Sequence, residues 1–136
     1  MIVWDERFRV GVKKLDEQHQ ELFKMVNDLS ENQDSTADSE LLLDVLERMS
    51  RHAEYHFTTE ERIMMEYGYP EYASQVREHT EFKTKTARFR TDAISGKSGL
   101  AREVLDYLES WLANHILESD LRFKDFLIDK GFLPKV

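Results

Sequence analysis

The chain contains four long segments in which apolar residues recur at every third or fourth position. This spacing places the apolar side chains on one face of a helix and is typical of amphipathic helices packed against a core. The alternating pattern of a half-buried strand is absent from the sequence. The four segments span residues 15–29, 42–67, 72–93 and 105–126. Together they predict an all-α protein.

Stretches without this periodicity separate the segments and mark the predicted connections. Residues 30–39 (SENQDSTADS) are polar, and residues 95–99 (SGKSG) are typical of a loop. Residues 67–70 (YGYP) place a glycine and a proline where a helix is expected to end. An irregular arm extends from Met1 to about Val12. Four amphipathic helices with modest connections predict an antiparallel up-down-up-down four-helix bundle with an irregular N-terminal arm.

Composition narrows the possible functions. The whole chain, residues 1–136, has the length of a single domain, and its formal net charge is −8. Nucleic acids and anionic membranes bind basic patches, so neither is an expected partner. No cysteine is present, which excludes disulfides, thiolate metal sites and cysteine nucleophiles. The sequence shows no signal peptide, no apolar span and no large exposed apolar patch, so we expect a cytoplasmic monomer.

All five histidines fall on the apolar faces of the predicted helices, at His19, His52, His56, His79 and His115. Two of the helices add a carboxylate near a histidine, at Glu60 and Asp120. Burying such groups unpaired costs several kcal/mol each, so something must satisfy them. One explanation is a purely structural hydrogen-bond network. The other is a bound cation, because imidazole and carboxylate suit divalent iron, zinc or manganese, and this number of ligands suits a pair of ions.

The spacing of the two carboxylates predicts a local irregularity in the fourth helix. His56 and Glu60 are four residues apart, about 40° around an ideal helix, so both can reach one centre. His115 and Asp120 are five residues apart, about 140° around the same ideal helix. For both to point at one site, the fourth helix needs a π-type turn, a feature often found at functional sites.

The ordered motifs resemble those of the bacterial hemerythrins over essentially the whole chain. They are the WDERFRVGV arm, LDEQHQELF, HFTTE, YPEYASQVREHTEF and HILESD. The resemblance implies an oxygen-binding protein rather than an enzyme, with two non-haem iron ions and a bridging oxo or hydroxo group. It implies that His19 and His56 bind one iron and that His79 and His115 bind the other. Glu60 and Asp120 are the implied bridging carboxylates, and molecular oxygen is the implied partner.

One position departs from the family pattern, in which the third helix carries two histidines four residues apart. Here His79 is present, but the position one turn earlier is Gln75. The Gln75 amide oxygen could replace the missing imidazole, a water could take its place, or that iron could bind poorly. His52 lies about 6 Å from His56 in the direction away from Glu60, so we expect a core histidine bonded to a nearby acceptor.

Three further functions stay open at this point besides oxygen transport, storage or delivery. The chain could be an oxygen or iron sensor, or a bundle with a degraded site. It could also be a peroxidase or oxidase that uses the position left open at Gln75.

Overall fold

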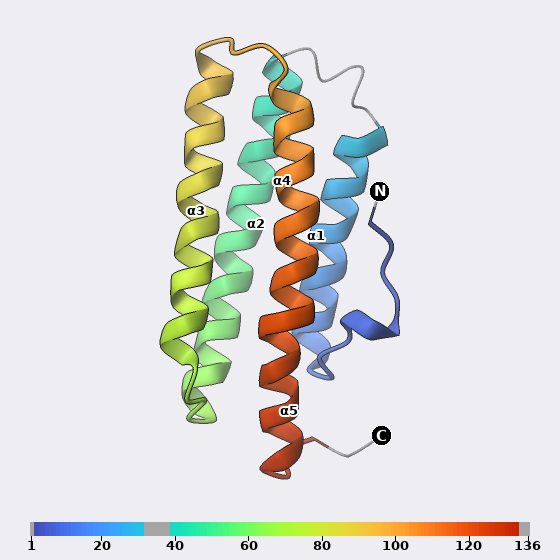
Figure 1. Ribbon diagram of the computed structural model, residues 1–136, viewed down its shortest axis with the longest axis vertical. Coiled ribbons are helices and arrows are strands. Elements are labelled where there is room, and N and C mark those ends of the chain that lie inside the picture. Colours follow the sequence, from blue (N-terminus) through green and yellow to red (C-terminus); the bar gives the residue numbers. More distant parts are fainter. Residues whose placement is uncertain (1, 32–38, 134–136) are drawn as a thin grey trace.

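The computed structural model describes residues 2–31 and 39–133, and four helical columns account for most of them (Figure 1). The columns run up, down, up and down, which confirms the predicted four-helix bundle. Each helix contacts the next along the chain, and α4 also contacts α1, so the four columns form a closed bundle. The elements are α1 (Lys13–Glu31), α2 (Ser39–Glu66), α3 (Tyr72–Ile94), and a fourth column made of α4 (Leu100–Asn114), η3 (His115–Asp120) and α5 (Leu121–Asp129).

The apolar faces of the helices form two separate clusters rather than one continuous core. The larger cluster includes Leu22, Phe57 and Ile116, and the smaller one includes Met64 and Phe123. A polar layer lies between them, because each column has buried polar side chains between these positions, among them His19, Glu60, His79 and Asp120. Charged residues cover the outer faces of the columns. Accordingly, no helix in the part of the chain that the structure describes has the length and apolarity of a membrane span.

The predicted connections agree with the structure wherever they can be compared. Helix α2 ends at Glu66, and Gly68 takes a φ of +67°, a conformation that other residues rarely adopt. Helix α3 ends at Ile94, directly before the predicted loop at 95–99. The predicted connection at 30–39 falls mainly on residues 32–38, which lie outside the described residues.

One core prediction was wrong. Tyr67 was placed on the apolar face of the second helix, but its side chain is 40% exposed. The helix ends one residue earlier, and Tyr67 lies in the turn that follows, where its ring packs against the ring of Phe132, 4.6 Å between centroids. The fully buried residue at this end of α2 is Met64.

The N-terminal arm is irregular, as predicted, and is fixed to α1 by hydrogen bonds. Its only helical part within residues 2–12 is the three-residue 3₁₀ turn η1 (Glu6–Phe8). The Asp16 carboxylate accepts from the backbone amides of Val10 at 2.7 Å and Gly11 at 3.1 Å. The Asn27 side chain accepts from the Ile2 amide at 3.0 Å. These contacts hold the arm against the helix that carries His19.

The predicted irregularity in the fourth column is present. Residues His115–Asp120 form a π-helix between two regular α-helices. A π turn contains an extra residue, which brings residues five apart onto the same face. Asp120 is therefore 1% exposed and points into the bundle together with His115.

Candidate metal centre

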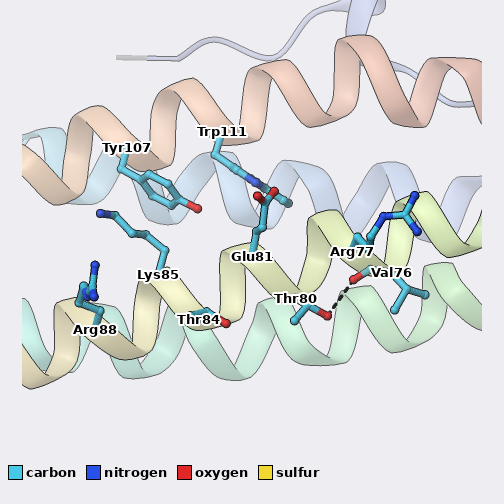
Figure 2. A pocket seen from close by; sticks show the side chains of 9 residues that line it. All are labelled: Val76, Arg77, Thr80, Glu81, Thr84, Lys85, Arg88, Tyr107 and Trp111. Atoms are coloured by element: carbon cyan, nitrogen blue, oxygen red, sulfur yellow. Dashed lines mark hydrogen bonds between the residues drawn. The ribbon is translucent and has the colours of Figure 1, made fainter.

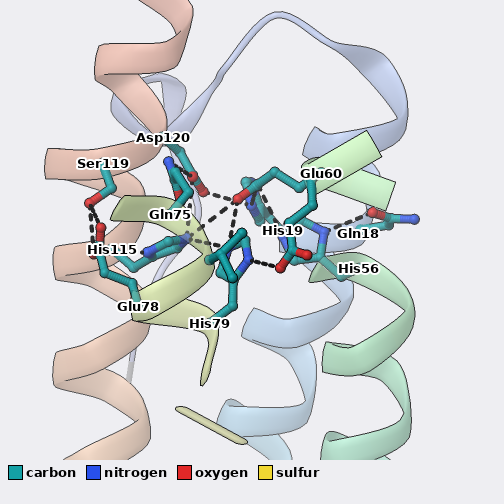
Figure 3. Close-up of polar contacts among 12 residues, drawn as sticks. Gln18, His19, His56, Glu60, Gln75, Glu78, His79, His115, Ser119 and Asp120 are labelled. Carbon is teal, nitrogen blue, oxygen red and sulfur yellow. Dashed lines mark hydrogen bonds and ion pairs between the residues drawn. The ribbon is translucent and has the colours of Figure 1, made fainter. Parts of the chain in front are cut away.

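The six residues predicted as metal ligands come together in the polar layer between the two apolar clusters (Figure 3). Each of them is no more than 3% exposed. All four columns contribute, since α1 provides one, α2 two, α3 one and η3 two of them. They are His19, His56, Glu60, His79, His115 and Asp120.

The Glu60 carboxylate lies at the middle of this group and divides its oxygens between two pairs of histidines. Its Oε2 lies 3.4 Å from His56 Nε2 and 3.5 Å from His19 Nε2. Its Oε1 lies 3.0 Å from His79 Nε2 and 3.5 Å from His115 Nε2. One carboxylate thus reaches two sets of nitrogen atoms, one on each side.

Asp120 divides its oxygens in the same way. Its Oδ2 lies 3.1 Å from His19 Nε2, and its Oδ1 lies 3.2 Å from His115 Nε2. Two groups of possible ligand atoms result, and within each group the atoms lie within 4.8 Å of one another. The groups are His19, His56, Glu60 and Asp120, and Glu60, His79 and His115. We call them the His19/His56 half and the His79/His115 half of the centre.

Several atoms that face the His19/His56 half have no hydrogen-bond partner in the described structure. They are Nε2 of His19, Nε2 of His56, Oε2 of Glu60 and Oδ2 of Asp120. They lie close to one another, but their alignment does not make hydrogen bonds. Each such buried group costs roughly 1–3 kcal/mol. A divalent cation would satisfy all four atoms at once, so the residues present fit a metal.

Three of the four histidines in the centre are oriented by a partner on the outward ring nitrogen, Nδ1. With a metal bound at Nε2, each acceptor would hold the ring proton on Nδ1 and fix the orientation of the ring. The pairs are His56 with Gln18 Oε1 at 2.7 Å, His79 with Glu61 Oε2 at 2.7 Å and His115 with Glu78 Oε1 at 3.2 Å. Ser119 Oγ donates to the Glu78 carboxylate at 2.7 Å and fixes its position.

Sequence reasoning missed these outer partners. Glu61 and Glu78 each stand next to an expected ligand in the sequence, but a glutamate on an amphipathic helix is most often solvent-exposed. Gln18 is 6% exposed although it also directly precedes a histidine. The available signal was this adjacency, and it becomes informative only once the helix faces are known.

Charge in the metal-free centre is balanced by protons. Burial disfavours a charged His19, but the nearby carboxylates of Asp120 and Glu60 outweigh it and raise the His19 pKa to about 9. Burial also disfavours a charged His115, but the Asp120 carboxylate outweighs it and raises the pKa of His115 well above its usual range. Burial and the nearby His19 lower the His56 pKa to about 4. Despite their burial, Glu60 and Asp120 have lowered pKa values because histidines surround them.

Gln75 reaches the centre, whereas His52 does not. The Gln75 side chain is 2% exposed, and its Nε2 donates to Asp120 Oδ1 at 3.1 Å. Its Oε1 is buried without a hydrogen-bond partner in the described structure. His52 is partly buried and its Nε2 lies 3.2 Å from the backbone carbonyl of Gln18, which confirms the expected bond to a nearby acceptor.

Aromatic rings close one side of the centre. The Phe57 ring stacks on His79 with centroids 4.0 Å apart, and Trp111 stacks on His115 at 4.5 Å. Trp111 also lines an open groove of about 750 Å³ between α3 and α4, where Tyr107 lies beside it (Figure 2). His115 lines a second groove of about 350 Å³ together with Trp111 and Glu78.

Comparisons with known proteins agree with this geometry. Residues 10–127 match the family described as the hemerythrin HHE cation binding domain. A bacteriohemerythrin of Clostridium acetobutylicum is 30% identical, over 92% of this chain and 100% of its own length. A myohemerythrin of Theromyzon tessulatum is 36% identical over 89% of each chain. A crystal structure of wild-type hemerythrin superposes with a TM-score of 0.83 at 25% identity, covering 92% of this chain and 96% of the other.

Proposed function

Because the chain belongs to the hemerythrin family, we propose that it binds molecular oxygen reversibly at a non-haem di-iron centre. The observation that carries the proposal is the shared use of two carboxylates, each with one oxygen toward each half of the centre. A single ion does not need this arrangement, whereas two ions sharing bridging ligands do. The proposed ligands are His19, His56, Glu60, His79, His115 and Asp120.

The carboxylates make a pair of divalent ions tolerable inside the bundle. Two ferrous ions carry four positive charges, of which Glu60 and Asp120 cancel two and a bridging hydroxide cancels one. When bound, the iron pair supplies a position for oxygen and the electrons that oxygen takes up. The imidazoles add no charge, and the acceptors on Nδ1 keep their Nε2 atoms turned inward.

The side chains around the centre exclude water. Leu15, Met64, Ile116 and Phe123 are each fully buried next to the polar layer, and Phe57 is 1% exposed. A dry pocket limits proton access and side reactions, which favours reversible binding over irreversible oxidation. This environment supports a role in oxygen transport, storage or delivery, or in oxygen sensing.

Anaerobic loading of the purified protein with ferrous iron, followed by cycles of oxygen and argon, tests the proposal. We expect a visible absorption band that appears with oxygen and disappears with argon over repeated cycles. Glu60→Gln removes one shared charge with little change of shape and should abolish the reversible band. Glu54→Gln makes the same change at an exposed position of α2 and should leave it intact. Irreversible bleaching, or no band in the unsubstituted protein, would contradict the proposal.

A peroxidase or oxidase is the second candidate, and one observation favours it. Gln75 offers an amide where the family pattern has an imidazole, and its Nε2 is engaged with Asp120. An ion in the His79/His115 half would then have a position open to peroxide or another small ligand. Turnover of peroxide with a reductant would support this candidate. Gln75→His should suppress that turnover and slow autoxidation, and an unchanged autoxidation rate would remove the idea.

A further inference from the structure

We infer that the two halves of the centre bind metal with unequal affinity and that the His79/His115 half holds an exchangeable ion. This inference rests on the proposed di-iron function and deepens it. Three features of the described side chains support the inference. They are the hydrogen bonds within each half, the different hydrogen bonding of the two Asp120 oxygens, and the orientation of the Gln75 amide.

The donor atoms of the two halves differ in whether they are already engaged. In the His19/His56 half, both Nε2 atoms and both carboxylate oxygens lack hydrogen-bond partners within the described residues. In the other half, His79 Nε2 makes a 3.0 Å hydrogen bond with Glu60 Oε1 and lies 3.3 Å from His115 Nε2. A metal entering that half must replace the hydrogen bond between His79 and Glu60, whereas the donor atoms of the first half face one another only as misaligned ion pairs.

The two oxygens of Asp120 are unequal for the same reason. Oδ1, which faces His115, accepts a hydrogen bond from the Gln75 amide at 3.1 Å. Oδ2, which faces His19, accepts none. The lone pair of Oδ1 that receives this hydrogen bond is not available to a metal. Asp120 therefore offers fewer free lone pairs on the side of the His79/His115 half.

The hydrogen bond to Asp120 determines which end of the Gln75 amide faces the carboxylate. Rotating the amide by half a turn would place Oε1 against Asp120 Oδ1, so that two acceptors would face each other. The Asp120 carboxylate thus fixes the amide nitrogen toward itself. Gln75 supplies a donor to the carboxylate and no imidazole to the metal, and both effects weaken binding in the same half.

This asymmetry links oxygen binding to the supply of iron. At low free ferrous iron, the His19/His56 half fills first and the protein carries one ion. Reversible oxygen binding needs both ions. The fraction of protein able to bind oxygen therefore changes most when the free ferrous concentration is close to the dissociation constant of the second ion. The chain would then respond to iron as well as to oxygen.

Titration of the metal-free protein with Co²⁺, followed by calorimetry and visible absorption, tests the inference without any activity assay. We expect two binding steps in the unsubstituted protein and one ion per chain retained after desalting. Since even outer-shell changes alter metal affinity about 10- to 100-fold, Gln75→His should tighten the second step at least about tenfold. The first step should stay the same, and two ions should be retained.

Controls separate this inference from the proposed function. His52→Gln exchanges an imidazole for an amide outside the centre, at a residue bonded to a backbone carbonyl, and should change neither step. Repulsion between two ions weakens the second step in any variant, so the comparison with Gln75→His is decisive. Should that variant fail to fold, retention of two ions by the unsubstituted protein after desalting overturns the inference alone. Equal second steps in both proteins overturn it as well, and absence of any Co²⁺ binding overturns the di-iron proposal itself.

Discussion

Glu60 and Asp120 come from different helical columns, yet each presents one carboxylate oxygen to each half of the centre. Glu60 reaches this position from a regular helix, four residues after His56. Asp120 reaches it five residues after His115, through the π-helix of η3. The π-helix thus compensates for the extra residue between His115 and Asp120, and both carboxylates face the centre in the same way.

Deleting Leu117, a 36% exposed residue of η3, tests the role of that extra residue. Removing one residue from a π turn restores a regular helix without rotating the flanking segments, so Phe123 and Leu127 should stay buried. We expect an unchanged helical content and a metal-free protein at least as stable as before. Metal affinity should stay within about tenfold, because His115 and Asp120 then lie four residues apart on a regular helix, the spacing that lets His56 and Glu60 reach one centre.

Deletion of Ser110, an exposed residue in the regular helix α4, is the matched control. It rotates all following residues by about 100° and should unfold the fourth column. Circular dichroism and metal titration of both variants decide the matter. Loss of metal binding in a Leu117 deletion that keeps its helical content would contradict this expectation.

The fold and the burial of the polar residues between the apolar clusters could largely be predicted from the sequence, because both follow from helical periodicity. Positions such as His19 and Phe89 are separated from their neighbours on the buried face by three or four residues, and they are buried as expected. The π turn was predictable because His115 and Asp120 could not share a face of a regular helix. Tyr67 was misplaced because periodicity does not show at which residue a helix ends.

The environment of the ligands could not be predicted, because it depends on contacts between helices. Gln18 and His56 lie 38 residues apart in the sequence and meet only when α1 packs on α2. The same holds for Gln75, whose identity marked a departure from the family but whose hydrogen bond to Asp120 required the fold. Sequence pattern thus identified ligand candidates, and packing determined how they are held.

Replacing Glu61 by Gln tests the outer support of His79. The Glu61 carboxylate accepts from His79 Nδ1 at 2.7 Å and holds the ring in position. We expect the affinity for the second metal ion to fall about 10- to 100-fold while the first step changes little. Glu54→Gln on the same helix serves as the control, since Glu54 is exposed. Equal affinities in the two variants would remove Glu61 from the account.

Stability of the metal-free protein should fall as the pH rises. The His19 pKa is raised from 6.5 to about 9 in the folded state. Protonated His19 contributes about 3 kcal/mol to the free energy of unfolding. This contribution is complete below pH 6.5 and is lost as the pH rises through 9. Urea unfolding at pH 6.5 and at pH 9 measures the difference. His19→Gln should reduce it, whereas His52→Gln should leave it unchanged.

The loaded protein should respond to pH in the opposite direction. Metal binding requires deprotonated imidazoles, and the raised pKa values of His19 and His115 mean that both carry protons in the metal-free centre at pH 7. We therefore expect proton release on loading with Co²⁺ at pH 7 and tighter binding as the pH rises toward 9. Calorimetry in two buffers of different ionisation enthalpy counts the protons. No proton release would contradict the charge balance described above.

Anomalous diffraction at the iron edge, from crystals grown after anaerobic loading with saturating ferrous iron, tests the central claim most directly. We expect two peaks in the polar layer, one beside His19 and His56 and the other beside His79 and His115, each within bonding distance of an oxygen of Glu60 and an oxygen of Asp120. The peak in the His79/His115 half should be the weaker after the crystals are washed in iron-free buffer. A centre without iron, in which the same histidines and carboxylates are satisfied by one another and by water, would contradict the account.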